Sequence, residues 1–321
     1  MLVNVIAFLV ILILTFINGL TDATNAISTV VGTKVMSFRK ACCLSAFFDV
    51  MGIFVMYFLN SSIVDCISSI ADLPGGTLGL SALCVGMISA ILFSSFAMFF
   101  GIPTSESHGL ISGITGAAIA VGGMKCVSKG AWLNVVLGLF WSIVGTVMIA
   151  KIVSLCIKGS VSKVSVNKIK RLQILSCAGM SFAHGAQDGL KFIGIMCIYV
   201  SIVSGNVVLE NEFILMFICA LTMGLGVLIG GRRIVATVGE DMVKLKNVEA
   251  FCSDVSTIFT LILASLFGMP VSTTHVKTMT VVSVSDGKLN RNKFKEIALA
   301  WGLTFPVCAI LAFVTMKLIL L

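Results

Sequence analysis

Two aspartates lie inside strongly apolar stretches of the chain, and each closes a short motif that opens with glycine. Asp22 ends the segment Gly-Leu-Thr-Asp at positions 19–22, and Asp188 ends the segment Gly-Ala-Gln-Asp at positions 185–188. A carboxylate at membrane depth costs about 2.5–3.5 kcal/mol on insertion scales, so it needs a cation, a proton or a basic partner. The neighbouring glycine favours an unwound helix, whose free carbonyls add oxygen ligands. These motifs therefore predict a cation site.

The ligands of this site are predicted from the oxygen-bearing side chains around the two aspartates. Carboxylate, amide and hydroxyl oxygens form a hard ligand set, which suits a small alkali cation. The predicted cation-binding residues are Asp22, Asn25, Thr21, Asp188 and Gln187, and the sodium ligands among them are Asp22, Asn25 and Asp188. Protonation of the aspartates is the competing interpretation, and a structural hydrogen bond between helices is the simplest alternative.

Two loops that begin with proline predict the opposite preference. Residues 103–108 are Pro-Thr-Ser-Glu-Ser-His, and residues 270–275 are Pro-Val-Ser-Thr-Thr-His. Proline ends one helix, and the free N–H groups and hydroxyls at the start of the next form an anion site of the kind that binds phosphate. The predicted phosphate-binding residues are Thr104, Ser105, Ser107, Ser272, Thr273 and Thr274. Ordinary N-capping by the same hydroxyls is the alternative for either loop.

Four more side chains beside these motifs are candidates for coupling or gating: Glu106, Lys191, His108 and His275. Glu106 would repel an anion, so it points away from the site, pairs with Lys191 or Lys277, or carries the coupling proton. Lys191 is expected first as the counter-ion of Asp188 and second as a phosphate contact. The two histidines are expected to lock their loops through hydrogen bonds rather than to transfer protons.

The motifs recur at one spacing, which indicates that the chain is a duplicated half. The aspartate motifs are 166 residues apart, and the proline loops are 167 residues apart. Two unrelated motifs that share an offset are typical of transporters built from two repeats. We predict a first membrane repeat at residues 1–157, a basic linker at 158–171 and a second membrane repeat at 172–321.

Composition predicts that the elements carrying these motifs are membrane helices. The chain is 58% hydrophobic and 11% charged, with a mean hydropathy of +1.11, whereas a soluble domain carries about 25% charged residues. Uncharged runs such as 2–17, 80–100 and 213–229 are long enough, or nearly so, to cross a hydrocarbon layer about 30 Å thick. The N-terminal run is expected to be a retained helix rather than a signal peptide, because it lacks a basic start.

The expected fold is an all-α polytopic membrane protein with two inverted-topology repeats and about ten to twelve membrane segments. Each repeat opens with a broken helix, interrupted near residues 18–25 in the first repeat and near 184–191 in the second. Each proline loop leads into a short, re-entrant-like half-helix.

Loop charges predict the orientation of these segments. The linker holds five basic residues and no acidic one, so it is expected on the cytoplasmic side. Segment 60–78 holds two acidic residues and no basic one, whereas its counterpart 231–248 holds four basic residues. Arg39 and Lys40 likewise correspond to a turn, 205–212, that is acidic. This opposite bias predicts inverted repeats with both termini external, and it assigns the net charge of +8 to cytoplasmic loops rather than to nucleic-acid binding.

At these motifs the chain resembles the inorganic phosphate transporter (PiT) family. Residues 19–26 resemble its GANDVANA signature, and residues 184–191 resemble the second copy, HGANDAQK. Residues 230–234 also match, and residues 268–275 resemble the segment GLPVSTTH. The resemblance spans essentially the whole chain, in order and with repeat symmetry.

The resemblance implies a cation-coupled symporter of inorganic phosphate that forms homodimers. It implies phosphate near the membrane midplane between the two proline loops, and sodium near the signature aspartates. Several residues depart from the family pattern: Leu20, Thr21, Glu106, Gln187 and Leu190. Because they touch the inferred ligands, these departures bear on the coupling ion and the substrate rather than on the fold.

We therefore expect a secondary active transporter, not an enzyme, that imports inorganic phosphate with sodium and needs no cofactor. Its expected partners are phosphate, sodium or protons, the lipid bilayer and a second copy of the chain, and not nucleic acid. Proton coupling and transport of another tetrahedral oxyanion, such as sulfate or molybdate, are the nearer alternatives. An ion channel, or an intramembrane enzyme that uses Ser272 with His275 on lipid phosphate, is more distant.

The orientation can be tested with reporter fusions. Alkaline phosphatase fused after Leu321 should be active, because this reporter folds only outside the cytoplasm and the C-terminus is expected there. The same reporter fused after Arg171 should be inactive, and a fluorescent protein at the two points should give the reverse pattern. Phosphatase activity at the linker would contradict the predicted orientation.

Overall fold

The computed structural model describes residues 2–161, 164–205 and 212–321 of the chain. Lys163 of the basic linker and Glu210 of the acidic turn lie outside the described residues. The described residues are almost entirely helical, and their one strand-like pairing is an isolated bridge between Ala71 and Val127. This confirms the all-α prediction, since a helix satisfies its own backbone hydrogen bonds in lipid.

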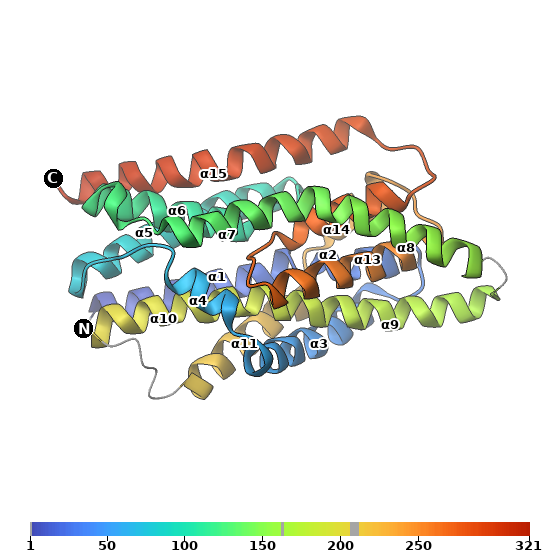
Figure 1. The fold of residues 1–321 in the computed structure, drawn as a ribbon, viewed down its shortest axis with the longest axis horizontal. Coiled ribbons are helices and arrows are strands. Elements are labelled where there is room, and N and C mark those ends of the chain that lie inside the picture. Colours follow the sequence, from blue (N-terminus) through green and yellow to red (C-terminus); the bar gives the residue numbers. More distant parts are fainter. Residues whose placement is uncertain (1, 162–163, 206–211) are drawn as a thin grey trace.

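The helices follow one another as a bundle of long and short segments (Figure 1). The N-terminal half contains α1 (Leu2–Thr21), α2 (Thr24–Gly32), α3 (Phe38–Leu59), α4 (Ser62–Ser68), α5 (Gly76–Phe99), α6 (Glu106–Gly122), η1 (Met124–Cys126), α7 (Lys129–Phe140), η2 (Trp141–Gly145) and α8 (Thr146–Val161). The C-terminal half contains α9 (Val166–His184), η3 (Gly185–Gly189), α10 (Leu190–Ser204), α11 (Glu212–Ile229), α12 (Arg232–Ala236), η4 (Thr237–Asp241), α13 (Asn247–Leu266), α14 (Thr273–Val284) and α15 (Arg291–Ile319). Segments η2, η3 and η4 are π-helical.

The chain is a multi-pass membrane protein. Among the described residues, seven helices are long and apolar enough to cross a membrane, or up to eight if the bent pair formed by α11 and α12–η4 counts as one span. This number is lower than the predicted ten to twelve segments. The difference arises because the prediction also counts the short helices α6 and α14 and, at its upper limit, both halves of each broken helix.

The two predicted helix breaks differ in form. The first is present, because α1 ends at Thr21, α2 begins at Thr24, and the turn between them contains Asp22. At 184–191 the chain instead stays helical, and the π segment η3 joins α9 to α10. A π turn accommodates an extra residue by widening the helix rather than by interrupting it. The prediction of a broken helix at 184–191 is therefore wrong, although the irregular segment lies at the predicted motif.

Both proline loops lead into short helices, as the sequence predicts. After α5 and α13 the chain turns at Gly101 and Gly268, whose φ angles of 69° and 64° lie in the left-handed region that favours glycine. Extended segments then reach α6 and α14. The same backbone turn thus precedes each half-helix.

Helices of the two predicted halves pack in matching pairs. α1 packs against α5 as α9 packs against α13, and α5 packs against α6 as α13 packs against α14 (Figure 1). The long helices that end each half cross to the other half, so that α15 covers α6 and α8 covers α14. Each half-helix is therefore enclosed by a helix from the opposite half.

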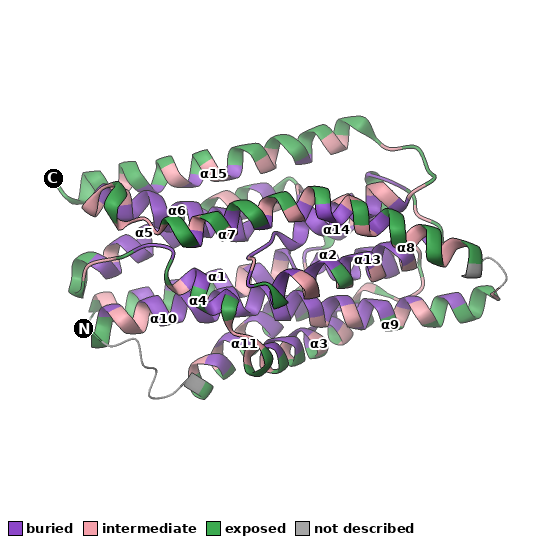
Figure 2. Cartoon of the chain, in the orientation of Figure 1, coloured by how far each residue is buried: buried purple, intermediate pink, exposed green. Residues whose placement is uncertain are grey.

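Buried residues gather at the centre of the bundle, and exposed residues lie on its outside (Figure 2). Large hydrophobic side chains such as Phe96, Phe140 and Leu155 are exposed, as lipid-facing side chains are. The buried residues include Asp22 and Asp188 together with many hydroxyls. Because ionisable groups inside a membrane protein are costly, this polar centre is the candidate functional region.

One end of the molecule gathers basic loops, and we call it the basic end. The end of α8 and the start of α9 lie at the opposite end from both termini (Figure 1). Lys158 pairs with Asp286 over 2.9 Å and donates to the carbonyl of Val284, which joins the end of α8 to the loop after α14. The hydrogen bond from Lys158 holds the pKa of Asp286 below its usual value. Lys158 lies near the end of α8, Lys168 and Lys170 lie near the start of α9, and the backbone of Lys244 lies beside Gly287 in the loop after α14.

Helix α3 approaches the α9–η3 segment more closely than larger residues would allow. A Cβ atom on Gly52 would collide with the carbonyl of Phe182, and one on Gly185 would collide with the carbonyl of Asp49. The two glycines therefore permit direct backbone packing. This contact also brings Asp49 within reach of His184.

Gly185→Ala should destabilise the protein, because the added methyl group meets a backbone carbonyl that cannot rotate away. We expect the free energy of unfolding to fall by about 1–3 kcal/mol, as in other overpacked interiors, with a lower midpoint of thermal unfolding in detergent. Gly302→Ala on α15 is the matched control, since its new Cβ has no atom within 4 Å. Equal midpoints for the two variants would contradict the importance of the close contact.

Candidate functional site

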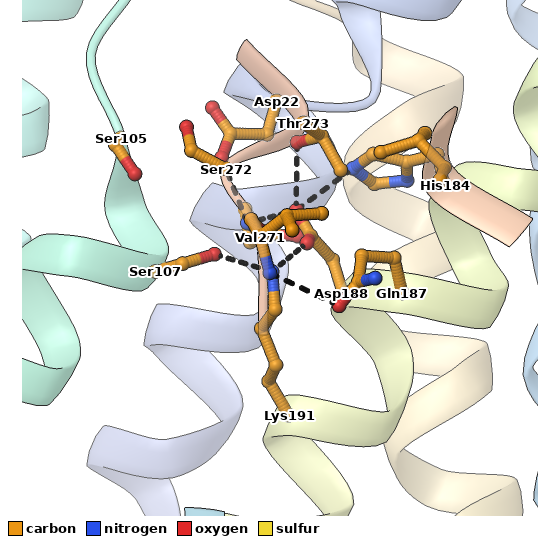
Figure 3. Close-up of polar contacts among 12 residues, drawn as sticks. Asp22, Ser105, Ser107, His184, Gln187, Asp188, Lys191, Val271, Ser272 and Thr273 are labelled. Carbon is orange, nitrogen blue, oxygen red and sulfur yellow. Dashed lines mark hydrogen bonds and ion pairs between the residues drawn. The ribbon is translucent and has the colours of Figure 1, made fainter. Parts of the chain in front are cut away.

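Four polar segments meet at the centre of the bundle (Figure 3). They are the turn between α1 and α2 with the helix ends on either side of it, the π segment η3 with the start of α10, and the two proline loops with the first turns of α6 and α14. Each of the fifteen predicted site residues lies on one of these segments, and none of these residues is more than 6% exposed. The structure therefore gathers both kinds of motif into one buried group, which we call the central cluster.

Asp188 accepts contacts from several sides of the central cluster. Its Oδ1 lies 2.5 Å from Nζ of Lys191, and its Oδ2 accepts a hydrogen bond from the hydroxyl of Thr273 over 3.1 Å. Nε2 of His184 lies 3.2 Å from the same Oδ2, and Nδ2 of Asn18 lies 3.4 Å from it. These partners lie on α9, α10, α14 and α1, so the carboxylate connects elements of both halves.

Lys191 joins the two proline loops. Besides its ion pair with Asp188, its ammonium donates to the hydroxyl of Ser107 over 2.7 Å and to the carbonyl of Val271 over 2.5 Å (Figure 3). Ser107 belongs to the first loop region and Val271 to the second. Because an ammonium has three hydrogens, these contacts use its full donor capacity.

Asp22 is held by the second proline loop rather than by a lysine. The hydroxyl of Thr274 donates to its Oδ1 over 3.0 Å, and Nδ2 of Asn25 donates to that same hydroxyl over 2.9 Å. Asn18 lies between the two motif aspartates, with its Nδ2 3.3 Å from Oδ2 of Asp22. The aspartates from the two sequence motifs therefore share a partner, and they belong to one site.

The loop hydroxyls that predict an anion site are bonded to the groups that predict a cation site. Thr273 and Thr274 donate to the two motif aspartates, and Ser107 accepts from Lys191. Thr104 in the first proline loop is also buried. The predicted cation and anion sites therefore interlock instead of lying apart.

Ser105 and Ser272 cap the two half-helices. The hydroxyl of Ser105 accepts a hydrogen bond from the backbone N–H of His108 over 3.3 Å, and that of Ser272 accepts one from the N–H of His275 over 3.2 Å. The capping alternative therefore describes these two serines. Each hydroxyl still keeps a proton that it can donate to a ligand.

Glu106 is buried at the start of α6, where Thr21 donates a hydrogen bond to its Oε1. The two lysines predicted as its partners are engaged by Asp188 and Asp254 instead. Of the three alternatives for Glu106, pairing with one of these lysines is therefore excluded. Among the described residues its Oε2 has no hydrogen-bond partner.

His108 and His275 pack as rings instead of forming hydrogen bonds. Their ring centroids lie 4.9 Å apart, His108 stacks on Phe305 at 4.5 Å, and His275 lies 3.9 Å from the Trp301 ring. Within the described part of the chain, their ring nitrogens have no hydrogen-bond partner. The expected lock through side-chain hydrogen bonds is therefore wrong, and the rings instead fix both half-helices against α15.

Gln187 forms hydrogen bonds with the end of α13 and with the second proline loop. Its Nε2 donates to the hydroxyl of Ser265 over 3.1 Å, and its Oε1 accepts from the backbone N–H of Val271 over 3.4 Å. Both ends of the amide are thus engaged away from Asp188. This position does not favour the predicted role of Gln187 as a cation ligand.

Sequence reasoning missed three polar residues that support the central cluster: Asn18, His184 and Asp49. Nδ1 of His184 lies 2.5 Å from Oδ1 of Asp49, while its other ring nitrogen faces Asp188. A signal for Asp49 exists, because it is the single charged residue in the stretch 41–59. Asn18 lies one helical turn before the first motif aspartate, on the same face of the helix.

The central cluster has oxygen atoms available for a cation. In the described part of the chain, the buried atoms Oδ1 of Asn18, Oδ1 of Asn25 and Oε2 of Glu106 have no hydrogen-bond partner. Buried acceptors are normally satisfied, so such atoms mark a place where a cation or a proton can bind. No group of three or more His, Cys, Asp and Glu among the described residues is arranged to hold a metal ion. The unpartnered carboxylate and amide oxygens form a hard donor set, which suits an alkali cation.

Known proteins resemble this chain over nearly its whole length. The family described as "Phosphate transporter family" matches residues 18–169 and 157–312. A protein of Bacillus subtilis named "Probable low-affinity inorganic phosphate transporter" is 30% identical over 308 residues, which are 92% of this chain and 91% of that protein. A protein of Rhizobium meliloti with the same name is 30% identical over 314 residues, which are 92% and 90% of the two chains. A solved structure described as "The sodium-dependent phosphate transporter" has a TM-score of 0.82 at 23% identity and covers 99% of both chains, so the folds agree.

Lys191→Gln should destabilise the protein, because it leaves the Asp188 carboxylate buried without its ammonium partner. Breaking a buried ion pair on one side costs about 3–5 kcal/mol, so the thermal unfolding midpoint in detergent should fall clearly. The double variant Asp188→Asn with Lys191→Gln should recover much of this loss. Lys317→Gln, an exposed lysine on α15, is the control. A single variant as stable as this control would contradict the central role of the ion pair.

Proposed function

The chain belongs to the phosphate transporter family, and we propose that it imports inorganic phosphate into the cell by symport with sodium. Its relatives are named as transporters and not as enzymes, so the intramembrane-enzyme alternative is set aside. The solved protein with the same fold is named as sodium-dependent. The hydrogen bonds and the charge of the central cluster support the same coupling in this chain.

The hydrogen bonds from Thr273 and Thr274 to Asp188 and Asp22 carry the proposal. A hydroxyl has one proton, so it cannot donate to phosphate while it donates to a carboxylate. A sodium ion that binds the carboxylates occupies their lone pairs and releases these hydroxyls toward the anion. Cation binding therefore prepares the phosphate site, and this order of binding couples the two ions.

The charge of the central cluster supports the same order. Three carboxylates, those of Asp22, Glu106 and Asp188, are buried near one lysine. A phosphate dianion placed beside them would be repelled, and burial in a medium of low dielectric strengthens that repulsion. Sodium ions at the carboxylates offset this charge. The loaded site is then closer to neutral, and the free energy needed to carry it through the membrane is lower.

We propose further that the two halves are inverted repeats that alternate access to the central cluster. The matched helix pairs and the matched turns at Gly101 and Gly268 support this arrangement. The loop charges support a cytoplasmic basic end and external termini. The resemblance to the PiT family supports our further proposal of a homodimer in the cell membrane of a prokaryote.

Two alternatives concern the ions. Protons in place of sodium are supported by the unpartnered Oε2 of Glu106, which can carry a hydrogen. Sulfate in place of phosphate is disfavoured, because HPO4 has a hydroxyl that can donate to a carboxylate such as Asp22 or Asp188, whereas sulfate has none at neutral pH.

Uptake of labelled phosphate into proteoliposomes, under separately imposed sodium and proton gradients, tests the proposal. A sodium gradient should drive accumulation, and Asp188→Asn should lower the gradient-driven rate by at least about tenfold, because it removes a charged ligand. Asp286→Asn, an exposed aspartate at the basic end, is the matched control and should keep the wild-type rate. Both variants should be compared at equal amounts of folded protein.

The remaining outcomes distinguish the alternatives. Accumulation driven by the proton gradient alone would show that protons, and not sodium, are the coupling ion. Inhibition of phosphate uptake by an equal concentration of sulfate would contradict selection through the phosphate hydroxyl. Sodium-driven uptake by Asp188→Asn at the wild-type rate would contradict the assigned cation site.

A further inference from the structure

A second buried ion pair lies outside the central cluster. Lys277 on α14 pairs with Asp254 on α13, and both side chains are fully buried. The hydroxyl of Thr29 on α2 donates to Oδ1 of Asp254 over 2.7 Å, and that of Ser176 on α9 donates to its Oδ2 over 2.9 Å. We call these four residues the inner cluster. No motif in the sequence points to it, and the coupling described above does not use it.

The inner cluster lies between the central cluster and the basic end. Thr29 follows Asn25 by four residues on α2, and Lys277 follows Thr274 by three residues on α14, so each lies about one turn, or about 5 Å, farther along its helix. α14 then ends at Val284, whose carbonyl accepts a hydrogen bond from Lys158 at the basic end. The two helices therefore connect the central cluster, the inner cluster and the basic end in that order.

Buried hydroxyls extend from the central cluster toward both ends, but the second buried ion pair lies on the side of the basic end. Beyond Lys277, the hydroxyl of Thr280 bonds to those of Ser253 and Thr257, each over 2.9 Å. Toward the termini, α1 and α10 contribute buried apolar side chains such as Leu14 and Ile195 to the largest hydrophobic core. A hydrated anion would therefore meet suitable partners on the side of the basic end.

Stability alone does not account for the inner cluster. Replacing a buried ion pair by apolar side chains of similar size is often neutral or stabilising, because desolvation of the charges offsets their attraction. A membrane protein has a further reason to avoid such groups, since each charge must be inserted at a cost. The pair is thus expected to serve the transported ions.

The donors of the inner cluster are arranged around an anion. One ammonium and two hydroxyls converge on the carboxylate of Asp254, and the same kinds of donor bind phosphate oxygens. We propose that the inner cluster is a second phosphate site, which the anion occupies between the central cluster and the basic end. Asp254 takes the place of the anion when the site is empty. Its negative charge then competes with bound phosphate for Lys277, which prevents the anion from being retained.

This inference rests on the proposed import of phosphate toward the basic end, and it predicts opposite effects for the two members of the ion pair. Asp254→Asn removes the competitor and should strengthen binding of phosphate from the inside. Lys277→Gln removes the main donor and should weaken that binding. A gate or a purely structural ion pair would instead respond in the same direction to both changes.

The test uses the full chain in proteoliposomes of known orientation, with sodium-driven uptake of labelled phosphate. Two quantities are measured: the external phosphate concentration that half-saturates uptake, and the internal phosphate concentration that halves it. We expect the internal value to fall about tenfold in Asp254→Asn and to rise about tenfold in Lys277→Gln, as for one charge-assisted hydrogen bond. The external value should stay within about twofold, since the central cluster is unchanged. Ser256→Ala is the matched control, because its buried hydroxyl donates to the carbonyl of Cys252 in its own helix.

Shifts of the internal value in the same direction for the two variants, or no shift, would overturn the second phosphate site. If either single variant fails to fold, Ser176→Ala keeps the ion pair, removes one donor and should raise the internal value about threefold, whereas an unchanged value would overturn the site. Failure of the proposed import is recognised separately, because the wild-type protein would then show no sodium-driven uptake at all.

Discussion

The ion pair between Asp188 and Lys191 is the interaction on which the centre of this protein depends. The ammonium uses its three hydrogens on a carboxylate, on the first half-helix and on the loop before the second one. A charge buried at membrane depth cannot exchange these partners for water, so each of them is held in place. Both proline loops are therefore positioned by one side chain, although they are 167 residues apart in the sequence. The same constraint explains why hydroxyls and carboxylates that bind different ions interlock.

The glycine of the second motif acts on this ion pair through a neighbouring helix. Gly185 lets α3 pack directly on the η3 backbone, and this contact places Asp49 beside His184, which in turn faces Asp188. A larger residue at that position would separate the helices. It would therefore displace Asp49 and His184, which support the Asp188 carboxylate. The π turn has a related effect, because it widens the helix at the motif while keeping it continuous. A motif that looks like a ligand-binding loop in the sequence thus also sets the distance between two helices.

Much of the fold and the membership of the central cluster can be predicted from the sequence, because both depend on local patterns. Apolar runs locate the long helices, and glycine or proline beside polar residues locates the irregular segments, so every predicted site residue is found in one buried cluster. The form of the second irregular segment cannot be predicted in this way, since a π turn and a break both place glycine beside a carboxylate. The pairing of Lys191 with Asp188 is predicted correctly, because the two lie one helical turn apart. The partners of Lys277, Glu106 and Gln187 are out of reach, because each has several polar candidates within one cluster. The pairing of Asp254 with Lys277 was missed because neither belongs to a repeated motif, and their proximity arises only from the packing of α13 on α14.

The crossing of the two final helices has a consequence for how the protein is made. α6 is enclosed by α15, whose residues 291–319 are the last described helix of the chain. Since synthesis runs from the N-terminus, the half-helix that carries Glu106 and Ser107 remains uncovered on that side until the rest of the chain has entered the membrane. The first half therefore cannot complete its own core by itself. Assembly of the polar centre must be among the last events in biosynthesis, and a chain truncated before α15 would leave buried charges facing lipid, a defect that cellular quality control could recognise.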